Sequence, residues 1–432
     1  MLRDCLFLSW GALCLLGTST VQGDNWPQWR GPQGDGICSE QNVPVSWGPE
    51  TNIAWKVPLP GPGGATPVVW GDRIFVTTSS GDDLLLICIS TKGEKLWERK
   101  VCTGNAIARG EEGNSASASP VTDGEHVWVF FGTGYLACFD MEGKEVWKFD
   151  VQTRYGKFAI AFGMTSTPLL EVDHLYLQLI HGDTGKDYIV GKVVKLNKLT
   201  GAEVWAVDRP TGAVSENKHG YASPVFFGAG KERVLVTHGA DHTIAYDLQT
   251  GAEVWRMAGL NGPSPYNPRF DNTLRFVASP VASGDALAIP TAKNGPALLL
   301  RPAHAKGNIT ESKEVVRWFN TKTPDVPCPL IYEGLVYFCR KDGKVFCCDL
   351  ETGEEYYYER THSAQHRASP VMAGGNLYLT ARDGHVTVLK AGKTLEIVSQ
   401  NELGETITAS PAFSNGVLYL RTFQHLIAIR RP

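Results

Sequence analysis

One tripeptide recurs along the whole chain and constrains its architecture more than any other feature. It consists of a small residue, then Ser or Thr, then Pro, and an aliphatic residue usually follows. Seven copies keep this form, and an eighth, at residues 327–330, is degenerate and has the sequence Pro-Cys-Pro-Leu. Eight units spaced 41 to 56 residues apart are typical of a repeat protein. The prolines of the eight copies are Pro67, Pro120, Pro168, Pro224, Pro280, Pro329, Pro370 and Pro411.

Each copy is followed by the same succession of short segments. A turn comes first, then a strand of alternating pattern such as 126–129, then a Gly-containing turn and a third strand. Next comes Thr-Gly-x-x-x-Trp or a variant, most clearly at 200–205 and 250–255. This succession predicts four antiparallel strands per unit, which is one blade of a β-propeller. The tryptophans expected on outer strands are Trp55, Trp97, Trp147, Trp205 and Trp255.

The residue types suit their predicted places in a blade. Inner strands converge at the axis of a propeller, where small side chains such as Ala and Ser fit. Pro is tolerated at the start of an inner edge strand because no partner needs its N–H group. The Gly after Thr allows the positive φ of a tight hairpin, and the Trp offers a large flat surface to pack between neighbouring blades.

The number of blades follows from the last repeat, which provides three strands only, at 409–413, 417–421 and 425–430. A fourth strand is available at 52–57, just before the first repeat, and it carries Trp55. Pairing the two ends of the chain would close the ring and remove exposed strand edges. We therefore predict an all-β fold, an eight-bladed β-propeller of four-stranded antiparallel blades closed by an N-terminal strand. Seven blades plus a degenerate sixth copy is the alternative.

The first residues are typical of an exported protein. Arg3 precedes the apolar stretch 5–16, and Val21 and Gly23 fit the small positions before a cleavage site. The stretch is too short to cross a ~30 Å hydrocarbon core, and no later stretch is long and apolar enough to do so. We predict export to the periplasm or the outside of the cell. The predicted parts are a signal peptide at 1–23, an N-terminal arm at 24–50 and a single propeller domain at 51–432.

Composition narrows the function classes. The chain has 41 Lys and Arg against 45 Asp and Glu, a net charge of −4, which argues against nucleic-acid binding through a broad basic surface. With 20% charged and 43% hydrophobic residues, it is neither a disordered tail nor a coiled coil. Cleavage would remove Cys5 and Cys14 and leave eight cysteines, and export permits disulfides among them without requiring any. We expect a monomer.

The repeat resembles that of the pyrroloquinoline-quinone-like (PQQ-like) propeller family. The resemblance rests on the Ser/Thr-Pro inner strands and the Thr-Gly-x-x-x-Trp turns, and it covers about residues 25–432. The run Trp-Pro-Gln-Trp-Arg-Gly-Pro at 26–32 is similar to the start of exported propellers of planctomycete-type bacteria. The family includes quinoprotein dehydrogenases and a non-catalytic outer-membrane assembly scaffold. The resemblance therefore implies the fold, and the function has to be argued from the site.

Candidate ligand residues come from the connections between blades, which emerge together on one face of a propeller. These connections are long here, and basic, amide and aromatic side chains gather in them. We interpret this loop face as a cationic, aromatic-lined mouth for an anionic ligand, with a protein or an anionic polymer as the partner. The residues just before inner strands, His219, Arg275, His366 and Arg367, are expected to point toward the axis. The candidates are Asn114, Lys157, His219, Arg269, Arg275, His366 and Arg367.

Cys347 and Cys348 need separate treatment, because in the quinoprotein dehydrogenases of the family a disulfide between adjacent cysteines packs on the cofactor. Here the pair lies in a predicted third strand, 344–350. Side chains alternate along a strand, so the two thiols are expected on opposite faces, packed in the core. The sequence contains no nucleophile elbow, zinc-protease motif, P-loop or EF-hand loop. We predict no catalytic residues and no metal site.

Three functions remain for the loop face, and the third of them is a lyase or hydrolase of polysaccharides, since such activities also occur on propellers. We favour an exported, non-catalytic scaffold that binds a partner in the cell envelope and needs no cofactor. The alternative is a dehydrogenase of alcohols or sugars that depends on pyrroloquinoline quinone and calcium. Such an enzyme needs a carboxylate base beside a metal held by Glu, Asn or Asp. The acids and amides available for it are Glu216, Asn217, Asp271, Asn272 and Asp325.

Overall fold

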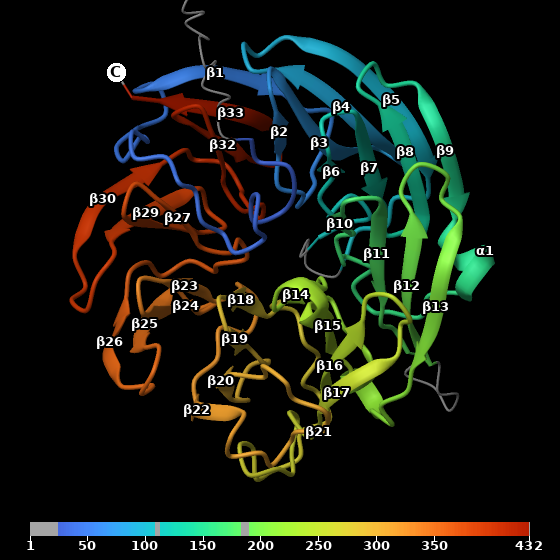
Figure 1. The fold of residues 1–432 in the computed structure, drawn as a ribbon. Helices are drawn as coiled ribbons and strands as arrows, with labels where there is room; N and C mark the ends of the chain where they lie inside the picture. The colour runs from blue at the N-terminus through green and yellow to red at the C-terminus, as the bar shows by residue number, and fades with distance from the viewer. Residues whose placement is uncertain (1–24, 109–112, 183–189, 432) are drawn as a thin grey trace, which may run out of the picture.

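The computed structural model describes residues 25–108, 113–182 and 190–431, and the predicted signal peptide lies outside them. Eight antiparallel sheets stand around a central axis in chain order (Figure 1). We number them as blades 1 to 8 from the first repeat. In each blade the innermost strand directly follows one of the Ser/Thr-Pro repeats. The predicted eight-bladed propeller of four-stranded blades is confirmed, and the seven-bladed alternative is wrong.

The first four blades occupy the part of the chain before residue 258. Blade 1 consists of β2 (Val68–Trp70), β3 (Arg73–Ser80), β4 (Asp83–Ser90) and β5 (Lys95–Thr103). Blade 2 consists of β6 (Val121–Thr122), β7 (His126–Phe130), β8 (Tyr135–Asp140) and β9 (Glu145–Asp150). Blade 3 consists of β10 (Leu169–Glu171), β11 (His174–Leu179), β12 (Gly191–Asn197) and β13 (Glu203–Arg209). Blade 4 consists of β14 (Val225–Phe227), β15 (Val234–Gly239), β16 (His242–Asp247) and β17 (Glu253–Met257).

The next three blades have the same construction. Blade 5 consists of β18 (Val281–Ser283), β19 (Ala286–Ile289), β20 (Ala297–Leu300) and β22 (Val316–Asn320). Blade 6 consists of β23 (Leu330–Tyr332), β24 (Leu335–Cys339), β25 (Lys344–Asp349) and β26 (Glu355–Arg360). Blade 7 consists of β27 (Val371–Ala373), β28 (Asn376–Thr380), β29 (His385–Lys390) and β30 (Ile397–Glu402). Helical segments are short: α1 (Val151–Tyr155) and the 3-10 turns η2 (Ser215–Lys218) and η3 (Gly230–Glu232).

Blade 8 joins the two ends of the chain. It takes β31 (Ala412–Ser414), β32 (Val417–Arg421) and β33 (His425–Arg430) from the C-terminal end and β1 (Ile53–Pro58) from the N-terminal end. β1 pairs antiparallel with β33, from Ile53 opposite Ile429 to Pro58 opposite His425. The predicted closure of the ring by an N-terminal strand is confirmed.

The second residue of each repeat links neighbouring blades at the axis, and it is Ser or Thr in seven copies and Cys328 in the sixth. In each link, the backbone N–H of this residue donates to the side chain of its counterpart in the next blade. The seven links, of 2.8 to 3.1 Å, run from Thr66 through Ser119, Thr167, Ser223, Ser279, Cys328 and Ser369 to Ser410. We call these eight residues the hydroxyl ring. It satisfies buried N–H groups where inner strands are too far apart to pair.

The outer-strand tryptophans lock each blade onto the next. The indole Nε1 of Trp97 donates to Met141 O at 2.9 Å, in the turn between the third and fourth strands of the next blade. The Gly of that turn is obligatory for packing as well as for its positive φ, because a Cβ at Gly143 would lie 2.7 Å from Trp97 Cδ2. The same arrangement recurs for Trp55 with Gly93, Trp147 with Gly201, Trp205 with Gly251 and Trp318 with Gly353. Trp55, Trp97, Trp147 and Trp205 therefore pack between neighbouring blades.

Blade 5 departs from the repeat and changes the edge of blade 4. Its third and fourth strands are joined by a longer connection that contains β21 (Gly307–Asn308). β21 pairs in parallel with β17, where Gly307 lies opposite Trp255. Trp255 is consequently almost fully buried, at 1% exposure, by an added fifth strand instead of by a Thr-Gly turn.

Apolar cores lie between adjacent blades, and they contain the adjacent cysteines. Cys348 belongs to the core between blades 5 and 6, whereas Cys347 belongs to the core between blades 6 and 7. The two thiols therefore lie on opposite faces of β25, as predicted. The eight cysteines of the described residues, from Cys38 to Cys348, are all buried.

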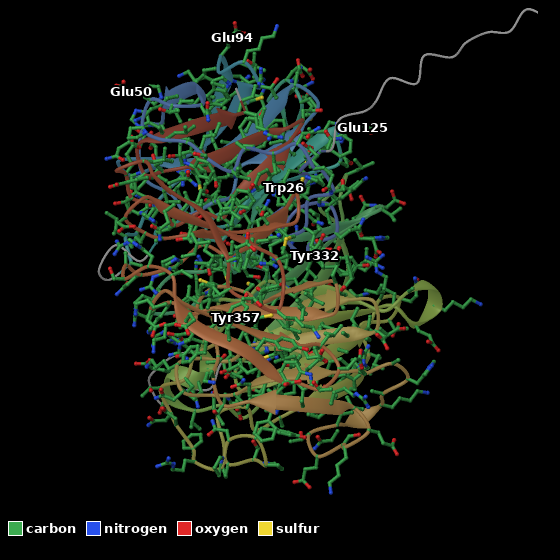
Figure 2. The ribbon with its side chains drawn as sticks, turned by 90° about the vertical axis from the view of Figure 1, so that its left-hand side faces the viewer. Trp26, Glu50, Glu94, Glu125, Tyr332 and Tyr357 are labelled. Carbon is green, nitrogen blue, oxygen red and sulfur yellow. The ribbon has the colours of Figure 1, made fainter. Side chains whose placement is uncertain are left out.

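The N-terminal arm runs into the centre of the ring, where Figure 1 shows it as the blue segment. Glu40 accepts backbone hydrogen bonds from Gly374 and Asn415, in turns between the first and second strands of blades 7 and 8, so the arm lies on the face opposite the blade connections. Trp26 exchanges two backbone hydrogen bonds of 2.9 Å with Val69 of blade 1. Arg30 Nη2 donates to Pro329 O, on the far side of the axis in blade 6, at 2.9 Å. Figure 2 shows Trp26 within the body of the ring and Glu50 and Glu94 at its edge. The arm thus acts as a plug across the channel.

Candidate functional site

The blade connections surround a cavity at the mouth of the central channel. We call it the upper cavity, and its volume is about 560 Å³, within the range of small-ligand sites. Members of the hydroxyl ring form its floor together with Trp29 of the arm. The inner strands carry the ring to the axis, and the connections that precede them supply the walls.

A second cavity of about 520 Å³ lies on the other side of the plug, between the arm and the inner strands of blades 3 to 5. Trp29 lines both cavities, so the arm divides the channel at this residue. Arg30, which is 2% exposed, holds the arm in place by donating to Asp35 O at 2.6 Å and to Pro329 O. Burial lowers the pKa of Arg30 and raises that of Asp35. A ligand of the upper cavity therefore enters from the loop face.

Basic side chains dominate the charge of the upper cavity. Among the described residues that line it, four are basic, Arg275, Lys293, Lys341 and Arg367, and one is acidic, Asp325. Asp325 is 8% exposed and accepts from Lys341 Nζ at 2.6 Å and from the backbone N–H of Lys293 at 3.0 Å. The carboxylate thus positions two of the basic residues. Because an enclosed array of like charges attracts the opposite charge, this cavity suits an anion.

Aromatic side chains complete the wall next to Arg275. The guanidinium carbon lies 4.6 Å from the ring centroid of Phe162, and an ion pair with Glu216 holds its other side. Phe162 and Tyr221 pack edge to face with centroids 6.1 Å apart. Burial raises the pKa of Tyr221 to about 12, so its hydroxyl stays protonated at neutral pH. The wall offers an apolar surface beside a fixed positive charge.

Two of the seven residues predicted from the sequence, Arg275 and Arg367, line the upper cavity. The expected orientation toward the axis is not observed for the two histidines, which are packed inside the connections. His219 is 1% exposed with its Nε2 2.7 Å from Gly182 O, and His366 is fully buried with its Nδ1 3.1 Å from Ala364 O. Burial lowers the pKa of both, that of His366 to about 4. They are neutral structural groups at pH 7.

The other three predicted residues lie outside the described lining of the cavity. Asn114 is 6% exposed, and its side chain ties two connections together by donating to Pro62 O at 2.8 Å and accepting from Ala116 N at 2.9 Å. Lys157 and Arg269 are exposed on the loop face. Residues 109–112 of the connection between blades 1 and 2 lie outside the described residues.

Three residues of the cavity were missed at the level of sequence. Lys293 and Lys341 belong to the turns between the second and third strands of blades 5 and 6, which emerge on the same face as the connections. Their position was predictable from the order of strands, because every turn between a second and a third strand emerges on the face of the connections. Trp29 belongs to the arm, and no repeat pattern indicates that the arm crosses the axis.

Four of the five residues named for a quinone- and calcium-dependent enzyme are engaged in other contacts, and they are Glu216, Asn217, Asp271 and Asp325. Asp271 accepts from Thr273 N at 2.8 Å, and Asn217 is 1% exposed and bonded to Leu274 N and Asp271 O. Calcium takes six to eight oxygen ligands, and the described residues contain no cluster of three or more His, Cys, Asp or Glu able to hold a metal ion. Cys347 and Cys348 cannot form a disulfide facing the cavity.

These observations define a class: an eight-bladed propeller with its channel plugged by the N-terminal arm and open, on the loop face, into a basic cavity. A family model described as "Outer membrane protein assembly factor BamB" matches residues 39–160, 190–298 and 306–431. The match covers more than half of the chain, and the chain belongs to this family. The predicted resemblance to PQQ-like propellers is confirmed.

Individual relatives agree with this family at low identity. BamB of Marinobacter adhaerens is 28% identical over 96 residues, which is 22% of this chain and 24% of that protein. The match thus spans about a quarter of the length of the curated relative. BamB of Moraxella catarrhalis has a similar structure, with a TM-score of 0.62 and 15% identity over 87% of this chain and 99% of that one.

Dehydrogenases of the same architecture are equally similar in fold. A europium-containing methanol dehydrogenase has a TM-score of 0.66 and 13% identity over 94% of this chain and 89% of that one. A quinohemoprotein alcohol dehydrogenase of Pseudomonas putida has a TM-score of 0.65 and 12% identity over 94% and 80%. At such identities the likeness shows the fold alone. No helix in the described part of the chain has the length and apolar character needed to cross a membrane.

Proposed function

We propose that this protein is an exported, non-catalytic scaffold that binds a partner protein in the cell envelope through its loop face. The observation that carries the proposal is the upper cavity, which gathers four basic residues and three aromatic ones. Membership of a family described as an outer-membrane assembly factor supports the envelope as the place of action. We expect the protein to act as a monomer after cleavage near Gly23.

The test is partner capture with and without the basic cavity. Immobilised wild-type protein and the double variant Arg275→Glu, Arg367→Glu are incubated with detergent-solubilised envelope from the producing organism. We expect a partner that the wild type retains and the variant loses, because the reversed charges repel an anionic partner surface. Circular dichroism should give both proteins the same melting temperature. Equal capture by the two proteins would contradict a role of the loop face.

The alternative function, a quinone- and calcium-dependent dehydrogenase, is supported by the likeness in fold to two dehydrogenases. It is tested by titrating the purified protein with pyrroloquinoline quinone and calcium while absorbance is recorded. A dye electron acceptor and a panel of alcohols and sugars follow. The scaffold proposal expects neither saturable cofactor binding nor dye reduction. Dye reduction that depends on the cofactor and the substrate would overturn it.

A further inference from the structure

The upper cavity has two unlike walls. Its basic side chains come from blades 5 and 6 and from the connections that flank them, at Arg275 and Arg367. Across the cavity, the described lining residues of the connections around blades 8 and 1 are small and uncharged. They are Gly64, Ala108, Gly113, Ser117 and Thr408. Among the described lining residues, the basic side chains therefore lie on one side of the cavity.

The charged wall is preorganised. Glu216 and Phe162 hold Arg275 from two sides, and Asp325 holds Lys341. Lys293 is the least committed, because its Nζ lies 3.4 Å from Thr273 O and Oγ1, beyond the usual range for a hydrogen bond of this kind. A carboxylate can replace these long contacts with a shorter, charge-assisted one. Little side-chain ordering then remains to oppose binding.

Three exposed apolar side chains belong to the connections that supply the cavity walls, and they favour a protein segment over a small anion as the ligand. They are Ile107, Val214 and Phe270, which are 66%, 48% and 51% exposed. A small anion enclosed in the cavity would leave these side chains in water. A protein segment that enters the cavity would cover them with its flanking residues, as apolar patches in protein interfaces are covered.

We propose that the upper cavity anchors the partner by taking in a short acidic segment of it. Carboxylates of the segment face Lys293 and Arg275, and an adjacent apolar side chain packs on Phe162 and Tyr221. This inference rests on the proposed scaffold function and specifies which part of the partner is recognised.

The experiment uses the mature chain and two blocked peptides as probes, acetyl-Gly-Glu-Phe-Glu-Gly-amide and its counterpart with Gln in place of Glu. Isothermal titration at 50 mM salt should give saturable binding for the acidic peptide and at least tenfold weaker binding for the Gln peptide. Lys293→Gln should weaken binding of the acidic peptide about tenfold, because it removes one charge-assisted hydrogen bond. Lys157→Gln and Arg269→Gln are matched controls, since both remove an exposed cation of the same face from outside the described lining. They should leave binding unchanged.

Equal binding of the two peptides, no binding of either, or equal weakening by Lys157→Gln would overturn the inference. Partner capture separates this failure from failure of the scaffold function. Where the acidic peptide does not bind and Lys293→Gln still captures the partner as well as wild type, the cavity is not the anchor and the scaffold function stands. If every protein captured by the wild type is also captured by the double variant Arg275→Glu, Arg367→Glu, the scaffold function itself fails.

Discussion

The contact between Trp318 of blade 5 and Gly353 of blade 6 allows a quantitative test of how blades are joined. Gly353 has a φ of +74°, and a Cβ added there would lie 2.6 Å from Trp318 Cγ and 2.7 Å from Cδ2. Carbon atoms pack at about 3.5–4.0 Å, so the indole or the turn would have to retreat by about 1 Å. The indole Nε1, which donates to Leu350 O at 2.9 Å, would move with it.

The chain offers a matched control in the same blade. Gly334 has a φ of +75°, and a Cβ added there meets no atom within 4 Å. Placing Ala in the left-handed region costs about 1–2 kcal/mol at either position. Gly353→Ala bears in addition the cost of overpacking, about 1–3 kcal/mol. We therefore expect Gly353→Ala to lose about 1–3 kcal/mol more stability than Gly334→Ala.

The assay is equilibrium unfolding in urea, followed by tryptophan fluorescence and by far-UV circular dichroism. Coincident transitions by the two probes are needed before free energies are compared. Gly143→Ala repeats the test between blades 1 and 2, because its φ is +78° and its Cβ would meet Trp97. Equal losses of unfolding free energy for Gly353→Ala, Gly143→Ala and Gly334→Ala would refute the reasoning, since backbone strain alone would then account for all three.

Three further outcomes are expected. Thr167→Val should lower the free energy of unfolding by about 1–3 kcal/mol, because it leaves the buried N–H of Ser119 without an acceptor. Thr66→Val is the control and should be nearly neutral, because Thr66 Oγ1 is buried and has no partner among the described residues. Similar losses of stability for the two variants in urea unfolding would contradict the role of the hydroxyl ring. Burial lowers the pKa of His366 from 6.5 to about 4, so the unfolded chain binds the extra proton between these values. The contribution of neutral His366 to the free energy of unfolding is complete above pH 6.5 and is lost as the pH falls toward 4. Between pH 7 and pH 5, His366→Gln should therefore lose less stability than the wild type. Burial raises the pKa of Cys88 and Cys348 to about 12. At pH 8 these thiols should therefore not react with Ellman's reagent in the native protein, and they should react in urea. Rapid labelling of either thiol in the native protein would show that the cores between blades are accessible to solvent.

The fold was predictable because its determinants are local and repeated. Proline marks the start of each inner strand and glycine the turn before most outer strands, and both act within a few residues. The link made by Ser119 or Ser223 was not predictable, since it joins residues about 50 apart and depends on how far inner strands splay at the axis. The plug formed by Trp29 and Arg30 was not predictable either, because the arm occurs once in the chain and shows no repeat pattern.

The site was only partly predictable. Arg275 and Arg367 were found from their place before inner strands, but the same rule misplaced His219 and His366. A connection leads toward the axis as a whole, whereas the direction of each side chain depends on the local backbone. The histidines turn inward because carbonyl groups of Gly182 and Ala364 lie close to their ring nitrogens.

The parts of the molecule that make the fold and those that make the cavity are largely separate. Blades are held by the hydroxyl ring, the interblade tryptophans and the cores, whereas the charge of the upper cavity lies on turns and connections such as those of Lys293 and Arg275. Changes in these loops therefore alter what binds while leaving the ring intact. This separation explains why the same architecture occurs in an assembly factor and in dehydrogenases. It also implies that reversing the charge of Arg275 and Arg367 should affect binding far more than unfolding, so that the two measurements together report on the site alone.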